Sequence, residues 1–126
     1  MASMKAGTNG VIVDTNVLIY SLKNKVDLES LLFSRFRISR IMVPDCVIKE
    51  LEGLSNSVIF AKGALRLAER FTKIESEDRG DPCILKTARK TGLPVLTNDR
   101  DFLLILKREG ITCMTLRNNR EIVLWS

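Results

Sequence analysis

Two segments of the sequence run from an apolar stretch directly into a carboxylate with hydroxyl and amide neighbours. They are VIVDTN over residues 11–16 and VLTND over residues 95–99, and their acids are Asp14 and Asp99. Open parallel sheets bind their ligands outside the carboxyl ends of the strands, where both acids would lie. The two acids are therefore expected at the same edge of one sheet.

Glu50 and Asp81 are two further acids that could join them. Glu50 borders the apolar stripe of a predicted helix over residues 45–54, so its side chain can reach toward the sheet edge. Carboxylates that gather without a cation repel one another, so four acids in one place imply a hard divalent ion. Since the chain has no histidine, oxygen ligation of Mg²⁺ or Mn²⁺ is favoured over a zinc or copper site.

Each of these acids also has an ordinary structural interpretation. Asp14, Asp81 and Asp99 all stand at the predicted start of a helix, where Asp is a preferred N-cap residue, and Pro82 suits the first turn after Asp81. Glu50 could be a solvated residue of its helix. The four acids favour a metal site only together, because each follows a different strand and the fold would gather them at one end.

The apolar pattern predicts an alternation of strands and helices. Helices are expected after Asp14, where Val17, Leu18 and Leu22 have helical spacing, and over 45–54, 61–71, 80–91 and 99–108. Strands are expected at 10–13, 41–43, 73–75, 95–96 and 112–116, with a last edge strand at 122–125. This order predicts a three-layer α/β/α sandwich with about five mostly parallel strands and right-handed crossovers.

Composition limits the remaining possibilities. The 126 residues fit one domain over residues 10–126, with the small polar residues 1–9 as a tail. A net charge of +5 favours polyanions such as RNA, and the absence of a long apolar run or signal-like segment predicts a cytoplasmic protein without a membrane span. The three cysteines are odd in number and scattered, so they are expected to be buried, reduced thiols.

The sequence resembles the PIN-domain family of nucleases. The resemblance runs from Gly10 to about Val123, and its segments occur in family order: VDTNVLI, VPDCVIKELEGL, GDPCILKTA and VLTNDRDFL. Within the family, the chain looks most similar to archaeal stand-alone domains related to small-subunit rRNA-processing nucleases, with the VapC toxins as the neighbouring group. The resemblance implies a PIN-like fold and hydrolysis of RNA phosphodiester bonds by an endoribonuclease.

The resemblance also implies roles for individual residues. The catalytic, metal-binding acids would be Asp14, Glu50, Asp81 and Asp99, with Asp101 as an additional ligand and Asn16, Thr97 and Asn98 as supporting residues. Many relatives carry a second acid after the third-motif aspartate, where this chain has Pro82. The number of metal ions, one or two, therefore stays open.

Substrate and partners are the least constrained part of the prediction. A basic stripe on the predicted helix is suited to RNA phosphates, although a solvated helix face is the alternative: Lys62, Arg66, Arg70 and Lys73. The resemblance implies an antitoxin partner if the chain is a toxin, or a ribosome-assembly protein if it processes rRNA. Pairing through helices among relatives, together with the apolar end at Trp125, predicts a homodimer.

Two rival functions remain at this point. One is a catalytically silent RNA-binding or scaffold PIN domain of a ribosome-assembly complex, which would bind RNA without cleaving it. The other is a phosphate-accepting receiver-like domain, which would need a lysine at the end of its final strand. This chain offers Arg117 there instead, after residues 114–116.

Overall fold

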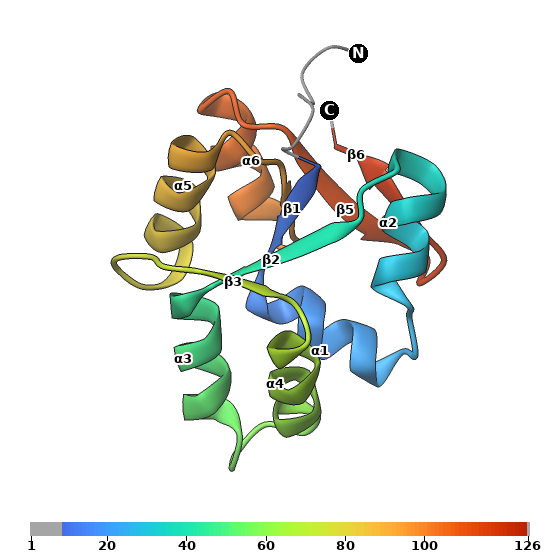
Figure 1. Ribbon diagram of the computed structural model, residues 1–126, viewed down its shortest axis with the longest axis vertical. Coiled ribbons are helices and arrows are strands. Elements are labelled where there is room, and N and C mark those ends of the chain that lie inside the picture. Colours follow the sequence, from blue (N-terminus) through green and yellow to red (C-terminus); the bar gives the residue numbers. More distant parts are fainter. Residues whose placement is uncertain (1–8, 126) are drawn as a thin grey trace.

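Strands and helices alternate along the chain, as the apolar pattern predicts (Figure 1). The computed structural model describes residues 9–125. The strands are β1 (Gly10–Val13), β2 (Arg40–Pro44), β3 (Thr72–Ile74), β4 (Val95–Leu96), β5 (Cys113–Arg117) and β6 (Glu121–Leu124). The helices are α1 (Thr15–Lys23), α2 (Leu28–Phe36), α3 (Asp45–Leu54), α4 (Ala61–Glu69), α5 (Gly80–Thr91) and α6 (Arg100–Arg108).

The strands form one mixed sheet in the order β3-β2-β1-β4-β5-β6. The first five are parallel to their neighbours, and β6 pairs antiparallel with β5 at the edge. In Figure 1, α5 and α6 lie together at the upper left of the sheet, and α1, α3 and α4 gather below it. The predicted α/β/α sandwich is confirmed, with six strands within residues 9–125 rather than about five.

The strand order reverses between β1 and β4. Strands β2 and β3 follow one another on one side of β1, and the chain then crosses over so that β4 and β5 lie on the other side of β1. Backbone bonds join the two central strands, from Ile12 N to Pro94 O at 2.9 Å and from Asp14 N to Leu96 O at 3.2 Å. A reversal of this kind opens a crevice at the carboxyl ends of the two strands, where α/β proteins bind ligands.

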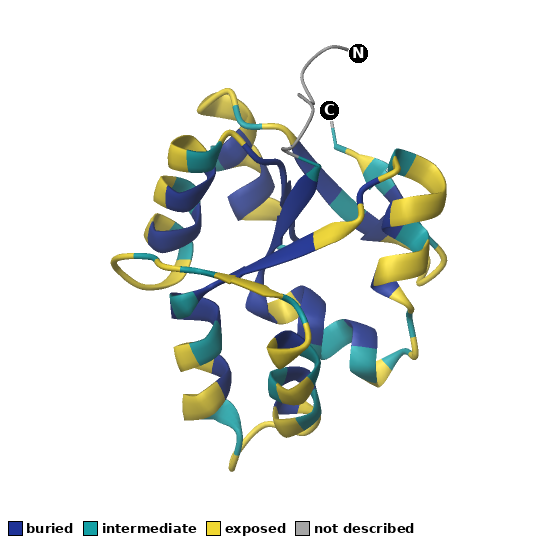
Figure 2. Ribbon diagram, in the orientation of Figure 1, coloured by how far each residue is buried: buried dark blue, intermediate teal, exposed yellow. Residues whose placement is uncertain are grey.

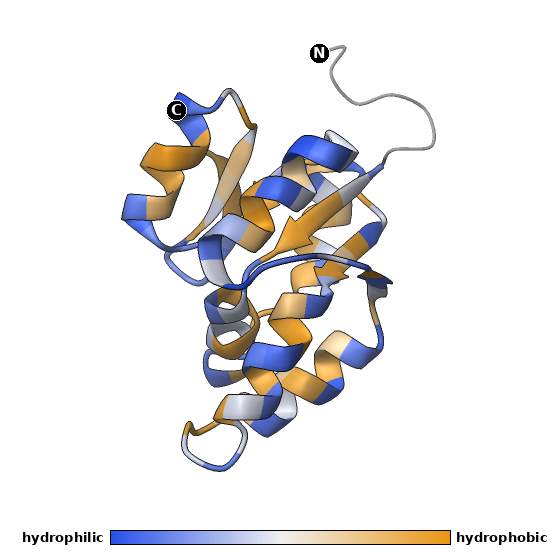
Figure 3. Cartoon of the chain, turned by 90° about the vertical axis from the view of Figure 1, so that its left-hand side faces the viewer, coloured by the Kyte–Doolittle hydropathy of each residue, from blue (hydrophilic) through white to orange (hydrophobic). Residues whose placement is uncertain are grey.

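The core lies on both faces of the central strands. Val11, Ile12 and Val13 are completely buried, which explains why β1 is a continuous apolar run rather than an alternating one. Figure 2 shows the central strands in the colour of buried residues and the outer sides of the helices as exposed. The hydropathy view agrees, with apolar strands at the centre and hydrophilic outer helix faces (Figure 3).

Helix α2 is not among the elements that the apolar pattern predicts. Only Leu28 and Leu32 of its nine residues are buried, so its apolar stripe is narrow. The helix is instead defined by its start, where Asp27 Oδ1 accepts from Ser30 N at 3.2 Å and Oδ2 accepts from the Ser30 hydroxyl at 2.8 Å. These hydrogen bonds hold the pKa of Asp27 below its ordinary value.

A disulfide joins Cys46 of α3 to Cys83 of α5, so the expectation of reduced thiols is wrong for these two residues. They are 37 residues apart in sequence, but the fold brings their Cα atoms to 6.6 Å. An odd number of cysteines excludes complete pairing, but it does not exclude one pair. Cys113 is free and buried, as expected, and burial raises the pKa of its thiol.

Residues 1–8 of the predicted tail and Ser126 lie outside the described residues, whereas the Asn9 side chain accepts a hydrogen bond of 2.9 Å from Ser39 N. Within residues 9–125, no helix is both long and apolar enough to cross a membrane.

Candidate active site

Asp14 lies at the carboxyl end of β1 and is 7% exposed. Its Oδ1 accepts a hydrogen bond of 2.7 Å from Thr15 N, so the side chain caps α1 as the structural interpretation predicts. Its Oδ2 accepts a hydrogen bond of 2.8 Å from the Thr97 hydroxyl at the end of β4. Asp14 is therefore both a helix cap and the residue that links the two central strands at their carboxyl ends.

Asp14 is an unusually weak acid for an aspartate. Burial is the main cause that raises its pKa from 3.8 to about 6, and the charges of Asp81 and Glu50 raise it further. The hydrogen bonds from Thr97 and Thr15 act in the opposite direction and keep the rise smaller. Asp14 is therefore a carboxylate that would gain from a nearby cation, since its own burial disfavours the charge.

Glu50 reaches the start of α1 from α3. Its Oε1 accepts a hydrogen bond of 2.7 Å from the hydroxyl of Thr15, the residue after Asp14. Glu50 is otherwise exposed, so it is not a core residue. The hydrogen bond to Thr15 shows that its side chain is not directed away from Asp14. This contact confirms that Glu50 can reach inward from the border of its apolar stripe.

Asp81 lies in the first turn of α5, where the N-cap is Arg79 and not Asp81. The capping interpretation, which Pro82 made attractive, is therefore wrong, because the helix begins earlier at Gly80. Gly80 has a φ of +60°, which a residue with a side chain rarely adopts, so glycine permits this early start. Burial raises the pKa of Asp81, and the charges of Asp99 and Glu50 raise it further.

Asp99 follows β4 and caps α6, since its Oδ1 accepts a hydrogen bond of 3.2 Å from Phe102 N. Its own N–H donates to the Thr97 hydroxyl oxygen at 3.2 Å. The completely buried Thr97 thus donates to Asp14 and accepts from Asp99. One hydroxyl fixes the positions of the two acid-bearing strand ends relative to each other.

The charges of the neighbouring acids reach Asp14 and Asp81: Asp81 and Glu50 raise the pKa of Asp14, and Asp99 and Glu50 raise that of Asp81. Within the described chain, no three acids or cysteines converge closely enough to hold a metal ion directly. The donor set consists only of carboxylate and hydroxyl oxygens, which suits a hard divalent cation. Glu50 is exposed and Asp81 only partly buried, so both can turn toward such an ion.

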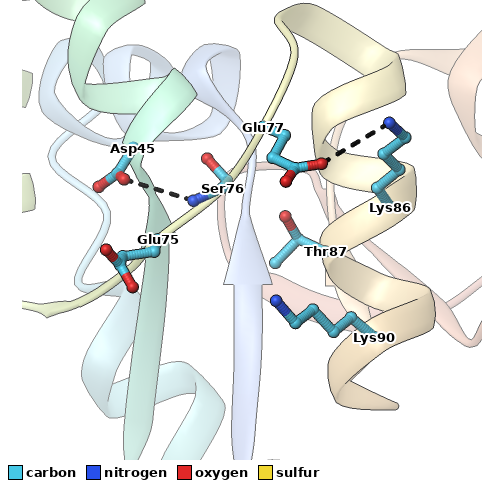
Figure 4. Close-up of a pocket in the computed structure, with 7 residues that line it drawn as sticks. All are labelled: Asp45, Glu75, Ser76, Glu77, Lys86, Thr87 and Lys90. Atoms are coloured by element: carbon cyan, nitrogen blue, oxygen red, sulfur yellow. Dashed lines mark hydrogen bonds and ion pairs between the residues drawn. The ribbon is translucent and has the colours of Figure 1, made fainter.

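A network of contacts holds the segment that precedes Asp81. Asp45 Oδ2 accepts a hydrogen bond of 3.3 Å from Ser76 N (Figure 4). The Ser76 hydroxyl in turn accepts one of 3.2 Å from Cys46 N. On the other side, Lys86 pairs with Asp78 at 2.7 Å. These contacts surround a cavity of about 490 Å³ of mixed charge, and together with the disulfide they fix the start of α5 against α3.

Residues 11–119 match the family model described as a PIN-like domain. The chain belongs to this family. It is 35% identical over 116 residues to ribonuclease VapC9 of Archaeoglobus fulgidus, covering 88% of this chain and 85% of that protein. It is 33% identical to the rRNA-processing protein fcf1 of Schizosaccharomyces pombe, covering 87% of this chain but 60% of that protein.

The solved structures agree with the family assignment of this PIN-like domain. The PIN domain endonuclease Utp24 superposes with a TM-score of 0.80 at 29% identity, covering 95% of this chain and 94% of the other. The resemblance to the PIN family that the four acidic motifs predict is thereby confirmed. The chain spans most of the length of VapC9 and a little over half that of the fcf1 proteins.

The predicted supporting residues of the PIN-like domain differ in their surroundings. Thr97 lies between two of the acids, as described. Asn98 Oδ1 accepts from the Thr115 hydroxyl and from Leu116 N, both at 3.1 Å, so this oxygen is used to join β4 to β5. Asn16 and Asp101 are exposed. Thr15 was not among the predicted residues, although its hydroxyl position directly after Asp14 in the first motif could have identified it.

The predicted basic stripe does not lie on one helix. Only Lys62 and Arg66 belong to α4, because the helix ends at Glu69. Arg70 caps that helix and pairs with Glu29 at 2.9 Å, and Lys73 lies on β3. Different cations accompany the acids: Lys49 and Arg79 line a cavity of about 650 Å³ together with Glu50, Cys46, Asp78 and Gly80.

Proposed function

We propose that this PIN-like domain is a Mg²⁺- or Mn²⁺-dependent endoribonuclease that hydrolyses RNA phosphodiester bonds. The observation that carries the proposal is the gathering of Asp14, Glu50, Asp81 and Asp99 at the strand reversal, with Thr15 and Thr97 joining acids from different elements. Helix capping alone would explain the positions of Asp14 and Asp99. It does not explain why Glu50 and Asp81 lie beside them.

The four acids are proposed as the metal-binding residues. When bound, a divalent cation activates water as a nucleophile and neutralises charge that develops on the phosphoryl oxygens, which suits a chain without histidine. Asp14 and Asp99 would hold the central position, because Thr97 fixes both strand ends. Glu50 would complete the site from α3, and Asp81 would contribute from α5, with Asp101 available at the exposed start of α6.

RNA is the proposed substrate, and Lys49 and Arg79, which line a cavity together with Glu50, are candidate phosphate contacts. Two biological roles agree with the relatives: VapC9 is named a ribonuclease, and the fcf1 proteins are named for rRNA processing. We propose one of these roles, with an antitoxin or a ribosome-assembly protein as the corresponding partner. A cytoplasmic location and a homodimer remain predictions from the sequence.

A catalytically silent RNA-binding or scaffold domain is the second candidate function. One observation favours it, since no three acids within residues 9–125 converge closely enough to hold an ion directly. This candidate predicts RNA binding that ignores divalent ions and yields no cleavage products.

The decisive experiment is cleavage of end-labelled RNA in the presence of Mg²⁺ or Mn²⁺. We expect loss of cleavage in the Asp14→Asn and Asp99→Asn variants and in a chelator. Glu50→Gln should also lose activity, whereas Glu52→Gln, a change of the same kind on the same helix at an exposed residue, should keep it. Retained cleavage in both aspartate variants would refute the assignment, and RNA binding without any cleavage by the wild type would favour the silent domain.

A further inference from the structure

A groove of about 650 Å³ lies beside the acids, between α6 and the last two strands. Its α6 wall includes Arg100 and Leu103, and its other wall includes Thr115 and Arg117 of β5 and Trp125 after β6. Tyr20 of α1 and Asn98 also line it. The volume is within the range of small-molecule sites, which are commonly a few hundred cubic ångströms.

The groove begins at the candidate active site. Asn98 and Arg100 line it, and they are the two residues on either side of Asp99. The turn between β5 and β6 closes this end, with Asn118 and Asn119 at φ of 55° and 58°, and Asn119 Oδ1 accepts from the Tyr20 hydroxyl. A ligand in the groove would therefore extend directly from a phosphate held at the four acids.

The polar and apolar groups of the groove are separated along its length. Arg100, Arg117 and the amide of Asn98 lie near the acids, and Trp125 lies toward the start of β5, since Trp125 N donates to Cys113 O. Arg117 already pairs with Glu121 at 3.0 Å, whereas Arg100 has no ion pair among the described residues. One end of the groove thus offers a cation without an ion pair among the described residues. The other offers part of the Trp125 ring, which also packs against the core and lies under the Lys107 ammonium.

Arg100 and Trp125 lie near opposite ends of α6. The Lys107 ammonium lies over the Trp125 ring at 5.7 Å from its centroid, so Lys107 marks the position of the indole on α6. Arg100 and Lys107 are seven residues apart on this helix, or roughly 10 Å at the helical rise. This separation is comparable with the length of a nucleotide from its phosphate to the far edge of its base.

We propose that the groove binds one unpaired nucleotide adjacent to the scissile phosphate, with its phosphate at Arg100 and its base against Trp125. The proposal rests on the proposed function, since it assigns the residues that receive the nucleotide beside the scissile phosphate. A base can enter the groove only when it is unstacked and unpaired. Stacking on an aromatic ring is tolerant of base identity, so the groove would select single strands more than sequence.

Trp125 is the only tryptophan of the chain, so its fluorescence reports on this groove alone. The probes are adenosine 5′-monophosphate, ribose 5-phosphate and a short unstructured RNA, titrated into the wild type in chelator so that no cleavage occurs. We expect the base-containing probes to quench the fluorescence and ribose 5-phosphate to leave it unchanged. Arg100→Gln should raise the half-saturating concentration about tenfold, as for the loss of a charged hydrogen bond.

A matched control uses the same helix. Arg108→Gln removes the same charge at the exposed end of α6, outside the groove, and should leave the half-saturating concentration unchanged. A second variant, Trp125→Leu, keeps an apolar side chain and should weaken binding of labelled RNA by about fivefold or more, since base stacking is lost. Phe33→Leu, at an exposed aromatic residue outside the groove, should leave RNA binding unchanged.

The outcomes separate this proposal from the nuclease assignment. If labelled RNA binds and is cleaved in Mn²⁺, but Trp125 fluorescence and Arg100→Gln show no effect, the groove proposal is overturned and the groove is free for another occupant such as a protein segment. Equal quenching by ribose 5-phosphate would also overturn it. Base-dependent quenching that needs Arg100 would support the groove even if the wild type fails to cleave RNA.

Discussion

The Thr97 hydroxyl at the end of β4 donates a 2.8 Å hydrogen bond to Asp14 Oδ2 at the end of β1. The same hydroxyl oxygen accepts a hydrogen bond of 3.2 Å from Asp99 N. The first of these bonds spans 83 residues of sequence. A single buried side chain thereby joins the two segments whose acids define the candidate site. The strand reversal brings the segments together, and Thr97 fixes their final geometry.

Replacement of Thr97 by valine should therefore affect both stability and activity. Valine keeps the shape but removes the donor to Asp14, and a buried group left without its partner costs about 1–3 kcal/mol of the free energy of unfolding. Urea denaturation measures this loss, and RNA cleavage should fall with it. Thr97→Ser should restore most of both.

A matched control is available on α5. Thr87 is similarly buried, and its hydroxyl donates to Cys83 O at 2.9 Å within its own helix. Thr87→Val should change stability without loss of cleavage beyond that change. Equal loss of cleavage in the Thr87 and Thr97 variants would show that Thr97 acts on stability alone.

Replacement of Asp14 by asparagine should abolish cleavage and, near pH 7 without metal, stabilise the fold. The pKa of Asp14 is raised from 3.8 to about 6, mainly by burial, so its ionised form opposes folding. A shift of this size corresponds to at most about 3 kcal/mol. Asparagine is uncharged and caps helices as well as aspartate does. Urea denaturation in chelator at pH 7 measures the gain.

The same raised pKa predicts how stability varies with pH. Between about pH 4 and pH 6 the folded chain keeps the Asp14 proton, whereas the unfolded chain has released it. The stabilisation of the fold by protonated Asp14 is therefore complete below about pH 4 and is lost as pH rises through about 6. The difference in unfolding free energy between wild type and Asp14→Asn should therefore widen from pH 4 to pH 7. A constant difference across that range would contradict a buried, weakly acidic Asp14.

Most of the fold follows from short local patterns in the sequence. The buried run before Asp14 and the apolar stripe of α3 predict their elements with bounds close to those observed, because periodicity depends only on burial. The apolar pattern does not predict helix α2, since its start depends on the Asp27 cap more than on a wide apolar face. The helical stripe of cations fails for a related reason: α4 ends before Arg70.

The candidate site was less accessible from sequence. The four acids can be named from their positions after strands, but the role of Thr15 depends on a side-chain contact with Glu50 that spans 35 residues. The disulfide is a similar case, since its two cysteines become neighbours only when α3 and α5 pack. Such pairings are tertiary, and no local spacing encodes them.

Reduction of the Cys46–Cys83 disulfide should destabilise the chain and weaken cleavage. Cys46 is one helical turn before Glu50, and Cys83 is two residues after Asp81, so the bond fixes two acid-bearing helices to each other. For a closed loop of this length, the entropic model gives a loss of about 4 kcal/mol. Urea denaturation and cleavage, each with and without reductant, measure the two effects.

The variant with both cysteines replaced by alanine should behave as the reduced wild type and ignore reductant. Cys113→Ala should remain sensitive to reductant, because Cys113 is outside the disulfide. If reductant lowers stability and cleavage equally in the double variant, its effect does not come from this bond.

Divalent cations should stabilise the chain, and more strongly above pH 6 than below it. A cation at the four acids relieves the repulsion and burial that raise the pKa values of Asp14 and Asp81, so binding competes with their protons. At a concentration one hundred times the Kd, a cation that binds only the folded state adds about 2.7 kcal/mol. Thermal denaturation with Mn²⁺ or chelator, at pH 5 and pH 7.5, measures the increase in Tm. Glu50→Gln should reduce the increase and Glu52→Gln should not. An increase that is the same at both pH values, or the same in both variants, would place the bound cation away from these acids.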